Sequence, residues 1–352
     1  LCAALVLLPS ALVAQAPATH PTRFTTGLVE QPAVRAALAW LDANFPGQVE
    51  EWIRLTEMPA KSTFEQQRAA YLKAQFEALG LETTIDSIGN VTARWRGTGG
   101  GDTVVFAAHM DTVHPMDTDV RVKRDGQTLR APGIFDNSAS LANMLAMARA
   151  MTRAGIRTRG DILFVGTVQE ELGLRGMEYW FASRPGFQGI LVALDGGLPN
   201  VNYGALGIYW TRYFFGAGGS HTNTSAGKPH PARALADAIR SIYEIRIPEG
   251  QGGAVYNVGM LNGGKIFNGI PEEVSFTMDL RSGNPTLLDS PTGSTDANIG
   301  VVRGIPSISI GRSRGGDQHT LSEWAHRDSA LPATKIALTI GVAMAGLADL
   351  TP

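Results

Sequence analysis

The sequence predicts an α/β protein with two domains. Four apolar runs, at 103–107, 162–168, 190–194 and 305–310, have the composition of buried strands and are separated by helix-like segments. A stretch at 207–290 changes character and carries its own strand–helix–strand–strand order. The 352 residues exceed what one hydrophobic core usually organises, and a hydrophobic content of 44% provides for large buried sheets.

Residues 1–16 form a short apolar run that ends in a small-x-small sequence, as secretory signal peptides do. The run is too short to span a bilayer. It lacks a charged beginning, so we expect a signal peptide that is truncated at its start. This predicts a secreted or periplasmic protein. Cys2 is the single cysteine, so the mature chain is expected to have neither a disulfide nor a cysteine nucleophile.

Two helices and a strand are expected before the first of these buried strands. The first helix covers 33–45, and the capping-box pattern Ser62-Thr63-Phe64-Glu65 opens another that ends at Gly80. The strand 91–95 then leads into the glycine-rich turn 97–101, which lacks the residue order of a phosphate-binding loop. We expect these helices, the strand and the turn to have structural roles.

Side chains able to bind metal recur at the ends of the predicted strands. In chain order they are His109, Asp111, Asp136 (just before a predicted helix at 141–151), Glu170, Glu171, Asp195 and His319. Ligands bind at the carboxyl edge of an open α/β sheet. Any single one of the carboxylates is more simply explained as a helix cap or a solvated loop charge. Chance alone, however, is a poor explanation for so many such side chains at strand ends. Two imidazoles and several carboxylates suit a pair of divalent ions.

The inserted segment 207–290 is expected to form a small α+β domain. Its strands are predicted at 208–215, 254–261 and 274–280, with an amphipathic helix at 231–245. This order fits a compact sheet covered by one helix.

Taken in order, the pattern His109-x-Asp111, Asp136, Glu170-Glu171, Asp195 and His319 resembles the M20 family of di-zinc exopeptidases and amidohydrolases. The resemblance implies a zinc-exopeptidase-type three-layer α/β/α catalytic domain formed by 17–206 and 291–352. It also implies that 207–290 is a lid through which two subunits form a homodimer. Two divalent metal ions are expected as cofactors, with Zn²⁺ as the first choice and Co²⁺ or Mn²⁺ as alternatives.

The resemblance also implies a role for each residue of the centre. His109 and Asp195 would bind one ion, His319 and Glu171 the other, and Asp136 would bridge the two. Asp111 would lie behind His109 and fix its tautomer. Glu170 would be the catalytic base that takes a proton from a shared water and passes it to the leaving amine.

Three lid residues match substrate-binding positions of the family. By resemblance, His221 reaches across the dimer to the oxyanion, while Asn268 and Arg281 hold a carboxylate or carbonyl of the substrate. From the residues alone, the first two are turn residues and Arg281 is a surface charge. The chain also departs from the family, because 282–294 is much shorter than the helix and strand that usually complete the lid. A lid shortened in this way is expected to expose apolar surface and a sheet edge.

The expected activity is hydrolysis of short peptides that have a free N-terminus, by an aminopeptidase or a di- or tripeptidase. Asp195-Gly196-Gly197 is similar to the peptidase T branch of the family. The alternative is a carboxypeptidase or an N-acyl-amino-acid amidohydrolase with the same centre, and a further one is a non-catalytic metal- and peptide-binding module. A net charge of −2 gives no basic surface for nucleic acid, and no Gly-x-Ser-x-Gly motif indicates a serine hydrolase.

Overall fold

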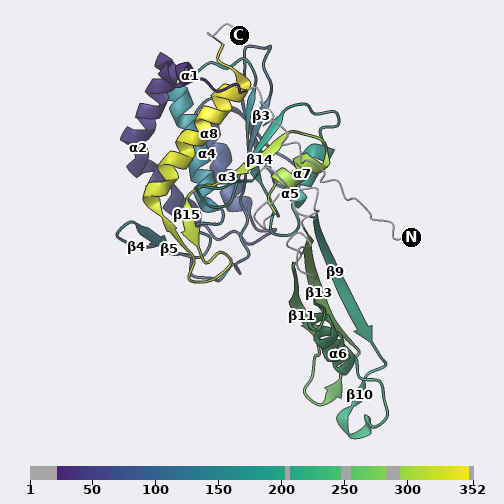
Figure 1. Ribbon diagram of the computed structural model, residues 1–352. Coiled ribbons are helices and arrows are strands. Elements are labelled where there is room, and N and C mark those ends of the chain that lie inside the picture. The colour runs from purple at the N-terminus through teal and green to yellow at the C-terminus, as the bar shows by residue number, and fades with distance from the viewer. Residues whose placement is uncertain (1–21, 203–206, 247–254, 283–293, 349–352) are drawn as a thin grey trace, which may run out of the picture.

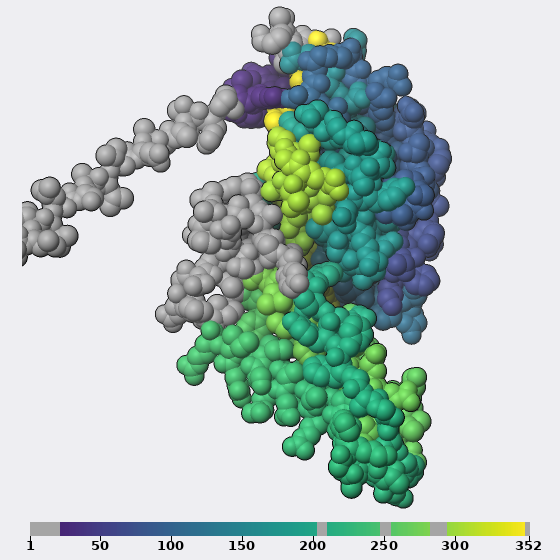
Figure 2. Space-filling view, turned by 90° about the vertical axis from the view of Figure 1, so that its right-hand side faces the viewer, coloured from purple at the N-terminus to yellow at the C-terminus, as the bar shows by residue number. Residues whose placement is uncertain are grey.

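The computed structural model describes residues 22–202, 207–246, 255–282 and 294–348. They form a larger unit built on a mixed seven-stranded sheet and a smaller unit that projects from it (Figures 1 and 2). The predicted α/β class, with layered helices around a central sheet and an additional small sheet, is confirmed. The predicted signal peptide lies outside the described residues. No helix among those described is long and apolar enough to cross a membrane.

The central sheet brings four parallel strands side by side. Its strand order is β1 (Glu82–Ile85), β2 (Val91–Trp95), β6 (Ile162–Thr167), β3 (Val104–His109), β7 (Ile190–Leu194), β14 (Ser307–Ile310) and β8 (Val201–Asn202). Strands β6, β3, β7 and β14 run parallel, while β1, β2 and β8 pair antiparallel with their neighbours. The residues that follow the four parallel strands therefore meet at one edge of the sheet.

Helices cover both faces of this sheet (Figure 1). One face carries α2 (Pro32–Thr56), α3 (Gln66–Glu77), α4 (Ser138–Arg153) and α8 (Ala330–Ala345), and their apolar side chains form the larger core. The other face carries α5 (Arg175–Ala182), whose Trp180 packs into a second core, and α7 (Ala297–Val302). All six residues of β3 are buried, because helices shield it on both sides.

A small four-stranded sheet holds two site loops together. Its order is β15 (Arg314–Gly316), β16 (Trp324–His326), β5 (Thr128–Arg130) and β4 (Lys123–Asp125). Because β16 pairs with β5, the segment that follows β5 lies beside the connection between β15 and β16. This pairing brings the loop before α4 next to the loop that carries His319.

The projecting unit has the predicted strand–helix–strand–strand order. Strands β9 (Gly207–Gly216), β13 (Glu273–Ser282) and β11 (Val255–Gly263) form its sheet with β13 in the centre, and α6 (Pro231–Tyr243) packs against β9 and β13. A short pairing of β10 (Ser220–His221) with β12 (Gly269–Ile270) lies at the end remote from the central sheet (Figure 1). We call this unit the lid.

Two local predictions were wrong. The first long helix does not stop at residue 45 but continues through Pro46 to Thr56. The capping box at 62–65 does not form: Glu65 occupies the N-cap of α3, and the Ser62 hydroxyl donates to Asp111 Oδ2 at 2.7 Å instead. A buried carboxylate brought near by the fold outcompetes the local cap.

Candidate metal centre

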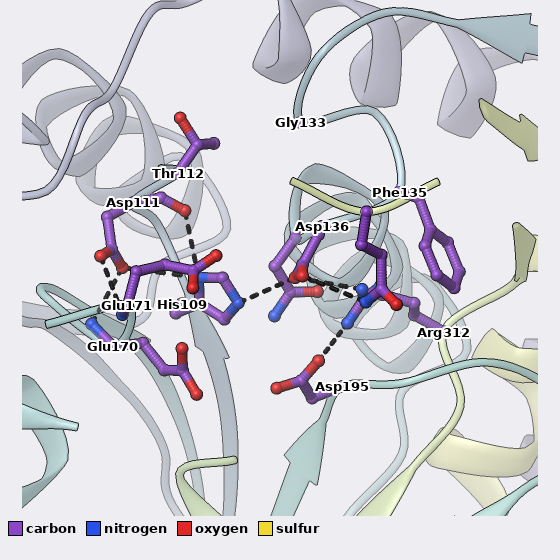
Figure 3. Close-up of polar contacts among 12 residues, drawn as sticks. His109, Asp111, Thr112, Gly133, Phe135, Asp136, Glu170, Glu171, Asp195 and Arg312 are labelled. Atoms are coloured by element: carbon purple, nitrogen blue, oxygen red, sulfur yellow. Dashed lines mark hydrogen bonds and ion pairs between the residues drawn. The ribbon is translucent and has the colours of Figure 1, made fainter. Parts of the chain in front are cut away.

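The structure brings the predicted ligand residues together at the carboxyl edge of the sheet. His109 is the last residue of β3, Asp136 precedes α4, and His319 lies between β15 and β16. The lining of a cavity of about 1070 Å³ at this edge includes His109, Asp136, Glu170, Glu171, Asp195 and His319. Residues more than two hundred positions apart thus share one site, most of which is shown in Figure 3.

Asp136 stands between the two histidines. Its Oδ1 lies 3.1 Å from Nε2 of His109, and its Oδ2 lies 3.4 Å from Nε2 of His319. Nε2 of His319 is also 3.0 Å from Oε1 of Glu171. Each carboxylate oxygen of Asp136 therefore faces a different imidazole, which is the arrangement that a carboxylate bridging two cations requires.

Asp111 lies beside His109 and also contacts the two glutamates. The His109 Nδ1 lies 3.1 Å from the main-chain oxygen of Asp111 and 3.4 Å from its carboxylate. The carboxylate also accepts the main-chain N–H groups of Glu170 and Glu171, at 3.0 and 3.1 Å. Both the main-chain oxygen and the carboxylate of Asp111 thus lie at Nδ1 of the histidine ring, and the carboxylate also holds the adjacent glutamates in place.

Arg312 is part of the site, although the sequence analysis did not single it out. Its fully buried guanidinium pairs with Asp136 Oδ1 at 3.0 Å and with Asp195 Oδ1, and it lies 4.2 Å over the ring of Phe135 (Figure 3). The available signal was an arginine two residues after an apolar strand, within Gly311-Arg312-Ser313. Asp195 also accepts the main-chain N–H of Gly196 at 2.6 Å.

Glu323 is a second residue that the sequence analysis missed. Its buried carboxylate accepts the main-chain N–H groups of Gly133, Phe135 and Asp136 at 3.0, 2.8 and 2.7 Å. The three hydrogen bonds accepted by this one carboxylate fix the loop that presents Asp136. Nothing in the local sequence Ser322-Glu323-Trp324 signals this role.

The charges of the cluster shift the pKa values of its members. Burial disfavours the charged forms of both Asp136 and His109. Even so, Arg312 and the two imidazoles hold the pKa of Asp136 well below its usual value. Burial alone would lower the pKa of His109, but the surrounding carboxylates, Glu170 first, raise it well above normal. Hydrogen bonds to Asp136 and Glu171 raise the pKa of His319 to about 10. Without a metal, carboxylates therefore hold protons on both imidazoles, which a bound cation must displace.

Glu170 has the opposite tendency. Burial raises its pKa well above the usual range, and the carboxylates of Asp195 and Glu171 add to the effect. Its side chain lines the cavity, and no hydrogen bond or ion pair fixes its carboxylate among the described residues. A buried carboxyl group that has a raised pKa and no fixed hydrogen-bond partner suits proton transfer.

The residues present fit a divalent ion. One ligand atom from each of His109, Asp136 and Glu171 can be chosen such that all three lie within 4.8 Å of one another. Imidazole nitrogen and carboxylate oxygen are good ligands for Zn²⁺, and they also accept Co²⁺ or Mn²⁺. His319 adds a second imidazole beside the same carboxylates.

The three lid residues divide between two places. Arg281 lines the cavity, and its Nε donates to Asp279 at 2.9 Å. His221 and Asn268 lie together near the β10–β12 pairing, where Asn268 Nδ2 is 3.3 Å from His221 Nε2 and both side chains are exposed. Neither of these two residues lines the cavity of its own chain.

The layered fold and the cluster of imidazoles and carboxylates define a metal-dependent hydrolase that acts on peptide or amide bonds. The chain belongs to peptidase family M20/M25/M40, whose family model matches residues 105–340. Members of this family typically use two metal ions.

Similar proteins include the uncharacterized protein YqjE of Bacillus subtilis, 27% identical over 258 residues, which are 69% of this chain and 68% of that protein. A putative LysW-lysine/LysW-ornithine hydrolase of Pyrococcus furiosus is 31% identical over 166 residues, 47% of each chain. The structure of aminopeptidase PepT from Bacillus cereus superposes with a TM-score of 0.62 at 20% identity, over 86% of this chain and 99% of that one. At 20% identity, the similarity to aminopeptidase PepT shows a common fold only.

Proposed function

We propose that the protein is an exopeptidase that removes residues from short peptides with a free N-terminus, as an aminopeptidase or a di- or tripeptidase. The observation that carries this proposal is the placement of Asp136, whose two oxygens face His109 and His319 separately. His109 and Asp195 would hold one Zn²⁺, and His319 and Glu171 the other. When bound, the ions supply an activated water and polarise the scissile carbonyl.

Glu170 is the proposed catalytic base. Its main-chain N–H is tied to Asp111, which sets the direction of a side chain that lines the cavity. Its raised pKa brings the carboxyl closer to the pH at which it can both accept a proton and return it to the leaving amine. Glu171, one position later, contacts His319, so the two adjacent glutamates divide base and ligand roles.

The cavity supports a short peptide as substrate. A volume of about 1070 Å³ is large enough for a few residues. Arg281 offers a guanidinium that can pair with the C-terminal carboxylate of a short peptide. The sequence Asp195-Gly196-Gly197, similar to the peptidase T branch, favours an aminopeptidase.

A metallo-carboxypeptidase or N-acyl-amino-acid amidohydrolase is the second candidate. The same centre serves both reactions, and Arg281 can equally hold the carboxylate of a C-terminal residue. The partial similarity to a putative LysW-lysine/LysW-ornithine hydrolase points in this direction. A metal- and peptide-binding module without turnover is a third candidate, which the free carboxylate of Glu170 disfavours.

Matched substrates separate these candidates. The enzyme, supplied with Zn²⁺, Co²⁺ or Mn²⁺, is assayed on Ala-Ala-Ala, on its N-acetyl form and on its C-terminal amide. We expect cleavage of the free tripeptide and no cleavage of the N-acetyl form. Cleavage of the N-acetyl peptide, together with no cleavage of the C-terminal amide, would identify the carboxypeptidase or amidohydrolase. Failure to cleave any peptide with both metal positions filled would favour the binding module.

We further propose that the protein is secreted or periplasmic and that its lid mediates a homodimer. The first rests on residues 1–16 of the sequence. The second rests on the remote position of His221 and on exposed apolar lid side chains such as Leu261 and Phe214. Sedimentation velocity tests the dimer, and detection of the mature N-terminus in culture medium or periplasm tests the export.

A further inference from the structure

We infer that Arg312 makes the two metal positions unequal, so that the position beside His319 fills first and the position beside His109 is markedly weaker. This inference rests on the proposed metal centre and adds an order of binding to it. It concerns a side chain of this protein that lies among the ligands without being one.

The contacts of Asp136 carry the argument. Its Oδ1 faces His109 at 3.1 Å and the guanidinium of Arg312 at 3.0 Å. Its Oδ2 faces His319 at 3.4 Å and accepts a hydrogen bond from the neutral amide of Gln318 at 3.1 Å. A permanent cation thus touches the oxygen on the His109 side, and an uncharged amide touches the other.

The same guanidinium also engages Asp195. Nη1 of Arg312 pairs with Asp195 Oδ1, so both carboxylates assigned to the ion beside His109 already share one positive charge. Figure 3 shows Arg312 between the carboxylates of Asp195 and Asp136. On the other side, Glu171 contacts His319, and no arginine or lysine pairs with it among the described residues.

Arg312 cannot easily withdraw from this position. Its side chain is fully buried, and its guanidinium lies over the ring of Phe135. An arginine does not lose its proton in a protein, and moving it away from both carboxylates would leave a buried charge unpaired. A divalent ion that binds between His109 and Asp195 therefore competes with a fixed cation for the same oxygens.

Coulomb repulsion gives the direction and scale of the effect. A monovalent and a divalent cation that share two carboxylates repel each other by enough to weaken binding roughly tenfold or more, even with strong screening. An ion beside His319 would contact the Asp136 oxygen that the guanidinium does not pair with, and it would contact Glu171, which pairs with no arginine or lysine among the described residues. The two dissociation constants should consequently be separated by at least about tenfold.

The test is a Zn²⁺ titration of the metal-free full chain in competition with a chromophoric chelator, which reads affinity and stoichiometry without turnover. The wild type should bind one ion tightly and a second more weakly. The variant H319A should lose the tight step, and H109A should keep it. Two equal steps in the wild type, or loss of the tight step in H109A alone, would overturn the inference.

Substitutions at Arg312 test the cause. R312M removes the charge at similar length and should tighten the weaker step by roughly tenfold or more, whereas R312K should keep the two steps apart. R314M is a matched control, because Arg314 pairs with Asp328 at the surface two positions away. If R312M binds both ions as the wild type does, the inference is wrong.

The titration also separates this inference from the proposed function. Two equivalent ions with normal peptidase activity would leave the function intact and remove only the role of Arg312. Two unequal ions without cleavage of any peptide would support the role of Arg312 and remove the proposed function. Should R312M fail to fold, the wild type, H109A and H319A still decide the order of binding.

Discussion

The carboxylate of Glu323 accepts the main-chain N–H of Asp136 at 2.7 Å. The same carboxylate accepts the N–H groups of Gly133 and Phe135, so one buried acid closes the whole loop that carries the central ligand. The orientation of Asp136 between His109 and His319 therefore depends on a residue nearly two hundred positions later in the chain.

Replacing Glu323 with glutamine should weaken metal binding. The amide keeps one acceptor oxygen, but its NH₂ group faces N–H donors, so charge-assisted bonds are lost and the loop shifts. We expect metal affinity to fall about 10- to 100-fold, measured by equilibrium dialysis with Zn²⁺. Glu57→Gln is the control, because Glu57 accepts a single main-chain N–H, that of Val122, at an exposed position. Equal affinities in both variants would contradict the role of Glu323.

Replacing Glu170 with glutamine should separate metal binding from turnover. The side chain lines the cavity but is not expected to be a ligand, so both ions should stay while kcat falls by about 10² to 10⁴. The measurements are metal content and peptide hydrolysis by the same preparation. Glu178→Gln, on the exposed surface of α5, serves as the control. A kcat near that of the wild type in Glu170→Gln would reject the base assignment.

Replacing Asp111 with asparagine should impair catalysis more than metal binding. The Asp111 carboxylate holds the main-chain N–H groups of both Glu170 and Glu171, while its main-chain oxygen, which the substitution retains, lies next to His109 Nδ1. We expect kcat to fall at least about tenfold, because loss of a charged acceptor costs about 1.5–3 kcal/mol. Zn²⁺ affinity should change less. A large loss of affinity with kcat intact would show that the carboxylate acts mainly through His109.

Replacing Asp296 with asparagine should change how stability depends on pH. Burial, opposed by a 2.6 Å hydrogen bond from Thr167, raises the pKa of Asp296 from 3.8 to about 7. The folded state thus holds this proton more tightly than the unfolded state, so its stability falls as the pH rises from about 4 through about 7. Asparagine can still accept from Thr167 and carries no charge.

The Asp296→Asn variant should therefore gain stability over the wild type at pH 8, by up to about 4 kcal/mol, and little at pH 4. Urea denaturation of the metal-free protein at both pH values measures the difference. Asp117→Asn, at an exposed position, should show no such pH-dependent gain. An equal effect of Asp296→Asn at both pH values would exclude the titration of Asp296 as the cause.

The dimer can be tested by complementation between two inactive variants. If His221 serves the cavity of a partner subunit, then H221A and Glu170→Gln should each be inactive alone. Mixed after dissociation and reassociation, they should recover about a quarter of wild-type activity, because half of the dimers are mixed and each holds one intact site. Absence of recovery in a mixture shown to exchange subunits would place His221 outside the reaction.

Several residues of the site could be predicted from the sequence because each lies at or just after the end of a continuous apolar run. The runs ending near His109, Glu170 and Asp195 coincide with β3, β6 and β7, whose strands are buried on both faces. Parallel strands then force their ends to one edge, so position along the chain translates into position in space.

Arg312, Glu323 and the true role of Ser62 could not be predicted in this way. Each is a polar side chain whose partner is distant in sequence: Asp195 and Asp136 for Arg312, the loop at 133–136 for Glu323, and Asp111 for Ser62. Local sequence patterns indicate helix caps and the buried faces of strands. They do not indicate which buried charged side chains, distant in sequence, contact each other in the fold. The capping box at 62–65 was misread for this reason.

The pairing of β14 with β7 has a consequence for the timing of activity. His319 follows β14, so the centre has its second imidazole only after the last strand has docked onto a sheet begun two hundred residues earlier. A chain still emerging from the ribosome, or one clipped before this docking, carries every other metal-binding side chain yet has no complete hydrolase. The complete metal centre therefore requires the chain to be present, and folded, at least as far as residue 319.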